Sequence, residues 1–162
     1  MFWKKSFGAG FIGGLDPVSA TRFTISSEDK VVAAGSCFAQ HVARHIQKRG
    51  FNFLQSEKAH PMFSPKKWDD ANGATFNYDA FSARYGNVYT ARQLRQLIDR
   101  AYCDFSPLAT HWERADGAFV DPFRPQVEPD GFVSAREVEL DRKFHLNAVR
   151  QALEVADVFV FT

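Results

Sequence analysis

The sequence has few cysteines, almost no net charge and no long apolar run. Its two cysteines, Cys37 and Cys103, are too few for a disulfide scaffold in a chain of 162 residues. Twenty basic residues are balanced by 19 acidic residues, and the net charge of +1 argues against a nucleic-acid partner. No segment approaches the roughly 18–20 consecutive apolar residues that cross a bilayer, so we expect no membrane span.

The N-terminal end also lacks the pattern of a cleaved export signal. Two lysines are followed by an apolar segment in which four of ten residues are glycine, and Asp16-Pro17 comes directly after it. We therefore interpret residues 1–22 as an N-terminal arm and residues 23–162 as part of a single domain. Reduced cysteines without an export signal make the cytoplasm the expected location.

What the sequence does contain is the composition of a folded protein. Hydrophobic residues make up 45% and charged residues 24%, values that are typical of a globular domain rather than a disordered chain. Seventeen residues are phenylalanine, so we expect a core or a pocket that is rich in aromatic rings.

A strand–helix–strand unit is predicted in the first third of the chain. The short apolar run Val31–Ala34 predicts a buried strand. Between Phe38 and Ile46 apolar residues recur every four positions, which predicts a helix that ends at Gly50. Phe51–Leu54 predicts a second strand, and the two strands should be parallel with a right-handed crossover.

The remainder of the chain alternates irregular segments with helices. Residues 55–89 lack periodicity but carry many aromatic rings, so we expect a packed covering segment, and residues 105–132 are again irregular. The sequences Thr90–Gln93 and Ser134–Glu137 each have the spacing of a capping box, and each predicts the start of a helix. Asp157–Phe161 predicts another buried strand. The whole is predicted to be α/β, and we expect a fragment of a longer domain because the chain stops directly after a core strand.

Candidate nucleophiles lie where the first strand gives way to the first helix. Gly35 permits a sharp turn, and Ser36 would then lie at the carboxyl edge of the sheet, beside the positive end of the helix. A hydroxyl there can attack a carbonyl while nearby amides stabilise the oxyanion. The alternative is that Ser36 is only the helix N-cap. Cys37 is the rival nucleophile because a helix N-terminus lowers the pKa of a thiol, although a free cysteine is more often a small apolar residue.

The histidines give weaker signals. Cys37, His41 and His45 line one helix, but the first and third are about 12 Å apart along the axis and cannot share one ion. We expect no metal site, and no glycine-rich phosphate loop indicates a cofactor. Asp141 and His145 lie four residues apart on the last helix, a spacing at which they can form a structural pair.

Several segments resemble one known family, in the order that the family has them. The run Gly35-Ser36-Cys37-Phe38-Ala39 spells the motif that names the GSCFA-domain family, and the resemblance covers most of the chain from about residue 23. The further segments that resemble the family are Tyr85–Leu94, Asp121–Pro125, His145-Leu146 and Asp157–Thr162.

The GSCFA family resembles a branch of the SGNH (GDSL-like) hydrolases, which implies a flavodoxin-like three-layer α/β/α fold with a parallel sheet. The resemblance implies that Ser36 attacks an ester carbonyl and that Gly86 and Asn87 bind the oxyanion or the substrate. In that superfamily the general-base histidine and its aspartate come near the C-terminus of the domain, and no histidine of this chain matches that role. The chain is thus expected to be the N-terminal part of one such domain.

Two classes of function follow from these observations. The first is an ester-processing enzyme, an esterase or O-acyltransferase that acts on a small-molecule or carbohydrate ester through Ser36. Little activity is expected from this chain alone, because a serine hydroxyl without a base is a poor nucleophile. The second is a non-catalytic domain that binds a ligand or a partner and uses Ser36 only as a helix cap.

Overall fold

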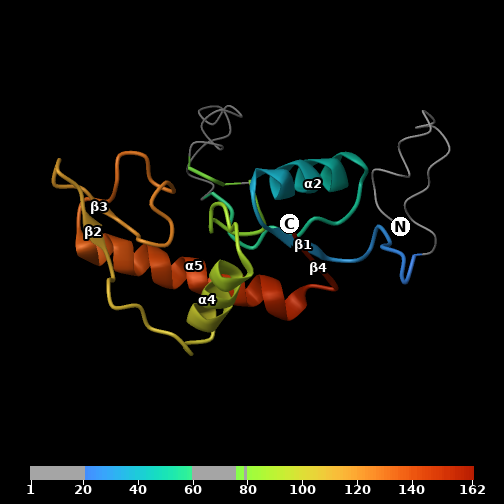
Figure 1. Cartoon of the computed structure of the whole chain (residues 1–162). Helices are drawn as coiled ribbons and strands as arrows, with labels where there is room; N and C mark the ends of the chain where they lie inside the picture. The colour runs from blue at the N-terminus through green and yellow to red at the C-terminus, as the bar shows by residue number, and fades with distance from the viewer. Residues whose placement is uncertain (1–20, 60–75, 79) are drawn as a thin grey trace, which may run out of the picture.

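The structure, a computed structural model, describes residues 21–59, 76–78 and 80–162. This part of the chain is α/β, with a small parallel sheet and helices (Figure 1). No helix in these ranges is long and apolar enough to cross a membrane. The elements in chain order are β1 (Val31–Ala34), α2 (Cys37–Lys48), α4 (Ala91–Ala101), β2 (Trp112–Glu113), β3 (Phe119–Val120), α5 (Ala135–Val155) and β4 (Val158–Phe161).

The parallel sheet joins the two ends of the described chain. Strand β1 pairs in parallel with β4, and Val31 lies opposite Val158. On its other side Val31 forms a single parallel bridge with Phe53. The strand predicted at Phe51–Leu54 therefore has the predicted direction, but it is reduced to one bridge and is not a full strand.

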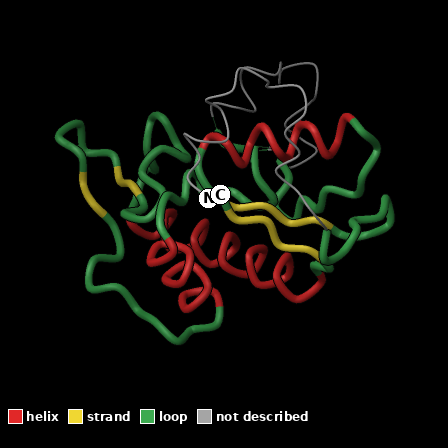
Figure 2. The backbone as a smooth tube through the Cα atoms, turned by 45° about the vertical axis from the view of Figure 1, so that its right-hand side comes forward, coloured by secondary structure: helices red, strands yellow, loops and turns green. Residues whose placement is uncertain are grey.

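Helices cover both faces of this sheet. Helix α2 lies on one face, and α4 and α5 lie on the other, as the two views show (Figures 1 and 2). Successive residues of a strand point to opposite faces. Accordingly Ala33 packs with Ala43 of α2, whereas Ala34 packs with Leu97 of α4 and Val149 of α5. Burial on both faces explains why β1 is a continuous apolar run. A complete flavodoxin-like fold stays a prediction.

Helix α2 ends as its sequence predicts. Ser36 is its N-cap, and the chain leaves the helix through Gly50, whose φ of +76° favours glycine. The N–H of Gly50 donates to the carbonyl of Gln47 at 3.0 Å, and that of Phe51 donates to the carbonyl of Ile46 at 3.1 Å. These two bonds form a Schellman motif, which fixes the direction of the chain after the helix.

The two predicted capping boxes differ in the structure. At α4 the box is complete, because the Thr90 side chain accepts from the Gln93 N–H and the Gln93 side chain accepts from the Thr90 N–H. At α5 the Ser134 hydroxyl accepts from the Glu137 N–H, but the Glu137 carboxylate accepts from Val133, one residue before the cap. Both helices begin where the sequence predicts.

The two irregular segments also have order. Within residues 105–132 the short strands β2 and β3 form an antiparallel pair that the sequence analysis did not predict, because each strand has only two residues. In the segment 55–89 the described residues Phe81, Tyr85 and Val88 are buried in the core between β1, α4 and α5. That part of the predicted covering segment is confirmed, and residues 60–75 and 79 lie outside the described residues.

Candidate functional site

The carboxyl ends of β1 and β4 meet at one edge of the sheet, where the candidate nucleophile lies. The Thr162 N–H donates to the carbonyl of Ala34 at 3.3 Å, and the Ser36 N–H donates to the carbonyl of Thr162 at 3.4 Å. Gly35 lies between them with a φ of +149°, and a Cβ there would stand 2.5 Å from the Thr162 carbonyl oxygen. Only glycine fits this close approach, so the turn before Ser36 has a steric requirement.

Ser36 is half-buried and acts as a helix cap in this structure. Its hydroxyl oxygen accepts a hydrogen bond from the Phe38 N–H at 3.3 Å. Among the described residues no histidine or carboxylate makes a hydrogen bond to this hydroxyl. The geometry is therefore compatible with both predictions for Ser36, a nucleophile at a helix N-terminus and a simple N-cap. The rival nucleophile Cys37 is exposed in the first turn of α2.

The segment that contains Gly86 and Asn87 lies against the same turn. The Val88 N–H donates to the carbonyl of Gly35 at 2.8 Å, which fixes this segment beside the turn. Gly86 adopts a φ of +68° and thereby bends the chain between the buried residues on either side. The side-chain oxygen of Asn87 is buried and has no hydrogen-bond partner among the described residues. The structure thus brings together the candidate residues 36, 86 and 87 at one end of the sheet.

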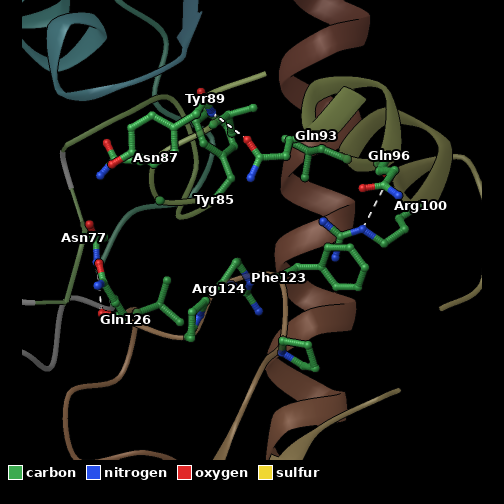
Figure 3. A pocket seen from close by; sticks show the side chains of 16 residues that line it. Asn77, Tyr85, Asn87, Tyr89, Gln93, Gln96, Arg100, Phe123, Arg124 and Gln126 are labelled. Carbon is green, nitrogen blue, oxygen red and sulfur yellow. Dashed lines mark hydrogen bonds between the residues drawn. The ribbon is translucent and has the colours of Figure 1, made fainter. Parts of the chain in front are cut away.

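A cavity of about 430 Å³ lies beside Asn87. One wall is the segment 85–89, a second is a face of α4, and a third is the loop 122–127 (Figure 3). Neither Ser36 nor Cys37 lines it. The walls carry amide side chains and aromatic rings, a mixture that suits a small polar molecule. Residues that contribute those groups are Asn77, Tyr85, Asn87, Tyr89, Gln93, Gln96, Phe123 and Gln126.

A buried network of charges holds the loop wall of the cavity in place. Arg124 is 2% exposed and pairs with Asp121 at 3.0 Å and with Asp141 of α5 at 2.7 Å. Asp141 also pairs with Arg84 at 3.2 Å, and Arg84 pairs with Glu128 at 2.6 Å. The guanidinium of Arg124 keeps the pKa of Asp121 low against the opposing effect of burial. Long side chains that share carboxylates in this way fix the loop rigidly against α5.

A second buried pair joins α5 to the segment after β1 and α2. The Nδ1 of His145 lies 2.6 Å from a carboxylate oxygen of Glu57, and the same oxygen accepts from the Arg84 N–H at 2.7 Å. Burial, together with the nearby Arg124, lowers the pKa of His145 to about 4 against the opposing effect of Glu57. The imidazole is therefore neutral at physiological pH and donates its Nδ1–H to the charged Glu57. Its Nε2 is buried and has no partner among the described residues.

The structure corrects the pairing predicted for His145. Asp141 lies one turn before it on α5 but pairs with Arg84 and Arg124, whereas His145 pairs with Glu57. A helical spacing of four residues identifies only a possible partner. The tertiary fold instead brings the buried carboxylate of Glu57 to the His145 ring. Glu57 and Arg84 carried no signal in the sequence beyond their charge, and Arg124 was marked only as part of the segment Asp121–Pro125 that resembles the family. On α2, His41 and His45 are exposed, and the described ranges hold no group of three or more residues that could bind a metal.

A model of the GSCFA family matches residues 30–162, so the chain belongs to this family. No curated protein and no solved structure matches it. Two segments that resembled the family in sequence, Tyr85–Leu94 and Asp121–Pro125, lie within the match and contribute opposite walls of the cavity. Segments separated by more than 25 residues thus form one feature at the carboxyl edge of the sheet.

Proposed function

We propose that this member of the GSCFA family contributes the nucleophile and the oxyanion-binding side of an ester-processing site of the SGNH type. The observation that carries the proposal is the position of Ser36, at the end of a doubly covered strand and at the N-terminus of α2. The hydrogen bond from the Val88 N–H to the Gly35 carbonyl supports the assignment of Gly86 and Asn87 to the oxyanion-binding side. The proposed architecture is a flavodoxin-like three-layer α/β/α fold whose parallel sheet contains this edge.

The chemistry is acyl transfer through the Ser36 hydroxyl. Its oxygen attacks the ester carbonyl, the proton passes to a base, and the alcohol leaves to give an acyl-serine. Water or a sugar hydroxyl then accepts the acyl group and regenerates the serine. The N–H of Gly86, the Asn87 side chain and amides in the first turn of α2 are the groups proposed to stabilise the oxyanion. The substrate is a small-molecule or carbohydrate ester, and Cys37 is the alternative nucleophile.

Among the described residues no general base makes a hydrogen bond to the Ser36 hydroxyl. His145 donates to Glu57 and lies in the core, so it is engaged in a structural pair. We therefore expect the 162-residue chain alone to turn over esters slowly or not at all, and the proposal concerns a reactive hydroxyl rather than a complete active site.

The second candidate is a non-catalytic domain that binds a small ligand. It is favoured by the hydrogen bond from the Phe38 N–H, which gives the Ser36 hydroxyl an ordinary capping role, and by the absence of Ser36 from the cavity lining. In this case the cavity is the functional feature, and Ser36 only begins helix α2.

Serine-directed labelling separates the two candidates, because the chain contains a matched capping serine. A fluorophosphonate forms a bond from phosphorus to the serine oxygen and releases fluoride, and mass spectrometry of the digested protein locates the adduct. Imidazole in the buffer can act as the general base for this reaction. We expect an adduct on Ser36 that increases with imidazole, in the wild type and in Ser134→Ala. It should be absent from Ser36→Ala.

Both substitutions remove an N-cap and should each cost about 1 kcal/mol of stability, so a difference in labelling reports reactivity and not folding. An adduct on Cys37 and not on Ser36 would identify the Cys37 thiol as the nucleophile. The complete absence of an adduct at residue 36, with and without imidazole, would contradict the esterase proposal and support the binding domain.

A further inference from the structure

Helix α4 carries a buried cation, Arg100, that lines the cavity. Arg100 is 6% exposed, and it makes no ion pair among the described residues. Its Nε donates to the Gln96 carbonyl of its own helix at 3.3 Å, and its guanidinium stacks on the ring of Phe123 at 3.8 Å. Its Nη1 is buried and has no partner among the described residues. Arg100 therefore differs from the neighbouring arginines, which have carboxylate partners.

The surroundings make the missing charge costly. Arg124 and Arg142 both repel Arg100, and the carboxylate of Asp121, which attracts it, is already shared by those two arginines. Burial lowers the pKa of Arg100 to about 10. A buried guanidinium without a partner is unfavourable, and the contact with one aromatic ring offsets only part of that cost. An anion in the cavity would restore the balance.

A second donor from the same helix faces the same cavity. The side-chain oxygen of Gln93 accepts hydrogen bonds from the N–H groups of Tyr89 and Thr90, at 2.8 and 3.0 Å. These bonds fix the orientation of the amide, and its nitrogen points away from Tyr89 toward the cavity (Figure 3). Gln93 and Arg100 are seven residues apart, so they lie on one face of α4 about two turns apart.

We propose that this cavity binds a small polar molecule through an anionic group, a carboxylate or a phosphate. The Arg100 guanidinium is the counter-charge, and the Gln93 amide nitrogen is a second donor. Nη1 of Arg100 is buried when no ligand is bound. Binding therefore includes a small rotation of the guanidinium over the Phe123 ring, which turns Nη1 toward the anion. The cavity volume of about 430 Å³ fits a molecule of the size of a sugar acid or a sugar phosphate. This site does not depend on the reactivity of Ser36, which lies outside the cavity lining.

The test uses three probes that share one sugar ring and differ in charge. Glucuronate carries a carboxylate, glucose 6-phosphate carries a phosphate, and glucose is neutral. Each is titrated into the 162-residue chain at constant ionic strength, with the heat of binding and the melting temperature as readouts. We expect at least one anionic probe to bind saturably and to raise the melting temperature. Glucose should do neither. The probe that binds more tightly identifies the source of the anion.

Two variants and one control assign the binding to Arg100. Arg100→Gln should weaken the anionic probe at least about tenfold, because it removes a charged donor. Gln93→Glu keeps the capping box but replaces the second donor with a carboxylate on the same wall of the cavity, so it should weaken anion binding at least about tenfold by repulsion. Arg95→Gln, on the exposed side of α4, should bind as the wild type does.

Three results would overturn the proposal. They are equal binding of glucose and the anionic probes, unchanged affinity in Arg100→Gln, and no saturable binding of either anionic probe to the wild type. Circular dichroism of each variant verifies the fold. If Arg100→Gln does not fold, Gln93→Glu decides alone, since unchanged anion affinity in that variant contradicts the site. None of these measurements depends on ester turnover, so the esterase proposal can fail while this one stands.

Discussion

Lowering the pH is expected to destabilise this protein through His145. The imidazole has no exposed surface and contacts Glu57, and Arg124 and Asp141 lie near enough to affect its charge. Burial lowers its pKa in the folded state from 6.5 to about 4. Between these values the unfolded chain binds a proton that the folded protein excludes. Stability is therefore complete above pH 6.5 and falls as the pH drops toward 4.

The magnitude follows from the two pKa values. At about 1.4 kcal/mol for each pH unit, the full loss is about 3 kcal/mol at pH 4, and about 2 kcal/mol of it is present at pH 5. Glu57 adds little to this effect, because its pKa is lowered in the folded state and the ordinary value of 4.5 leaves the unfolded carboxylate mostly charged at pH 5. A loss of 2 kcal/mol is a large part of the stability of a typical domain.

Urea unfolding at pH 7, 6 and 5, followed by circular dichroism, measures the effect. The control is His145→Gln, whose amide can still donate to Glu57 but does not titrate. Groups other than residue 145 change the free energy of unfolding of both proteins in the same way. Once this common part is subtracted, the free energy of unfolding of the variant should change by less than about 0.5 kcal/mol between pH 7 and pH 5. Parallel curves for the two proteins would refute a neutral buried histidine. A wild type that gains stability toward pH 5 would show that His145 is charged and forms an ion pair.

Two further predictions concern the turns that position the candidate site. Gly35→Ala should destabilise the protein by at least about 2 kcal/mol in urea unfolding, because the new Cβ would meet the Thr162 carbonyl. The control Gly50→Ala has open space for its Cβ and should cost only about 1 kcal/mol. Equal losses in the two variants would contradict the steric role of Gly35. Thr90→Ala removes one arm of the capping box and should cost about 1 kcal/mol in thermal unfolding, and an unchanged melting temperature would show that α4 is held by packing alone.

Local patterns were sufficient for the elements that position the site. The apolar run Val31–Ala34 is a buried strand, and the helices begin at the predicted caps Ser36, Thr90 and Ser134. These predictions succeeded because strands, caps and glycine turns depend on residues close together in the sequence. The strand predicted at 51–54 was only partly correct, since the number of residues that pair depends on a partner far along the chain.

The charged groups of the candidate site were not predictable in this way. Glu57 contacts His145 across 88 positions, and Arg84 contacts Asp141 across 57 positions. Neither pair has a spacing that a single sequence reveals. Arg100 was not predictable either, because its proposed role depends on the lack of an ion pair among the described residues. An arginine on a helix is normally predicted to be solvated, and only the structure shows that Arg100 is buried against the loop 122–127 without an ion pair among the described residues.

The sequence by itself determined the α/β class, the turn at Gly35 and the position of Ser36 at a helix start, because backbone conformation and apolar periodicity are local properties. It also carried the motif by which the chain resembles its family. Only the tertiary structure decided that Asn87 lies beside that turn, that Glu57 is the partner of His145, and that a cavity faces Arg100. Those facts depend on which segments pack together, and packing determines burial, which in turn sets charge and pKa.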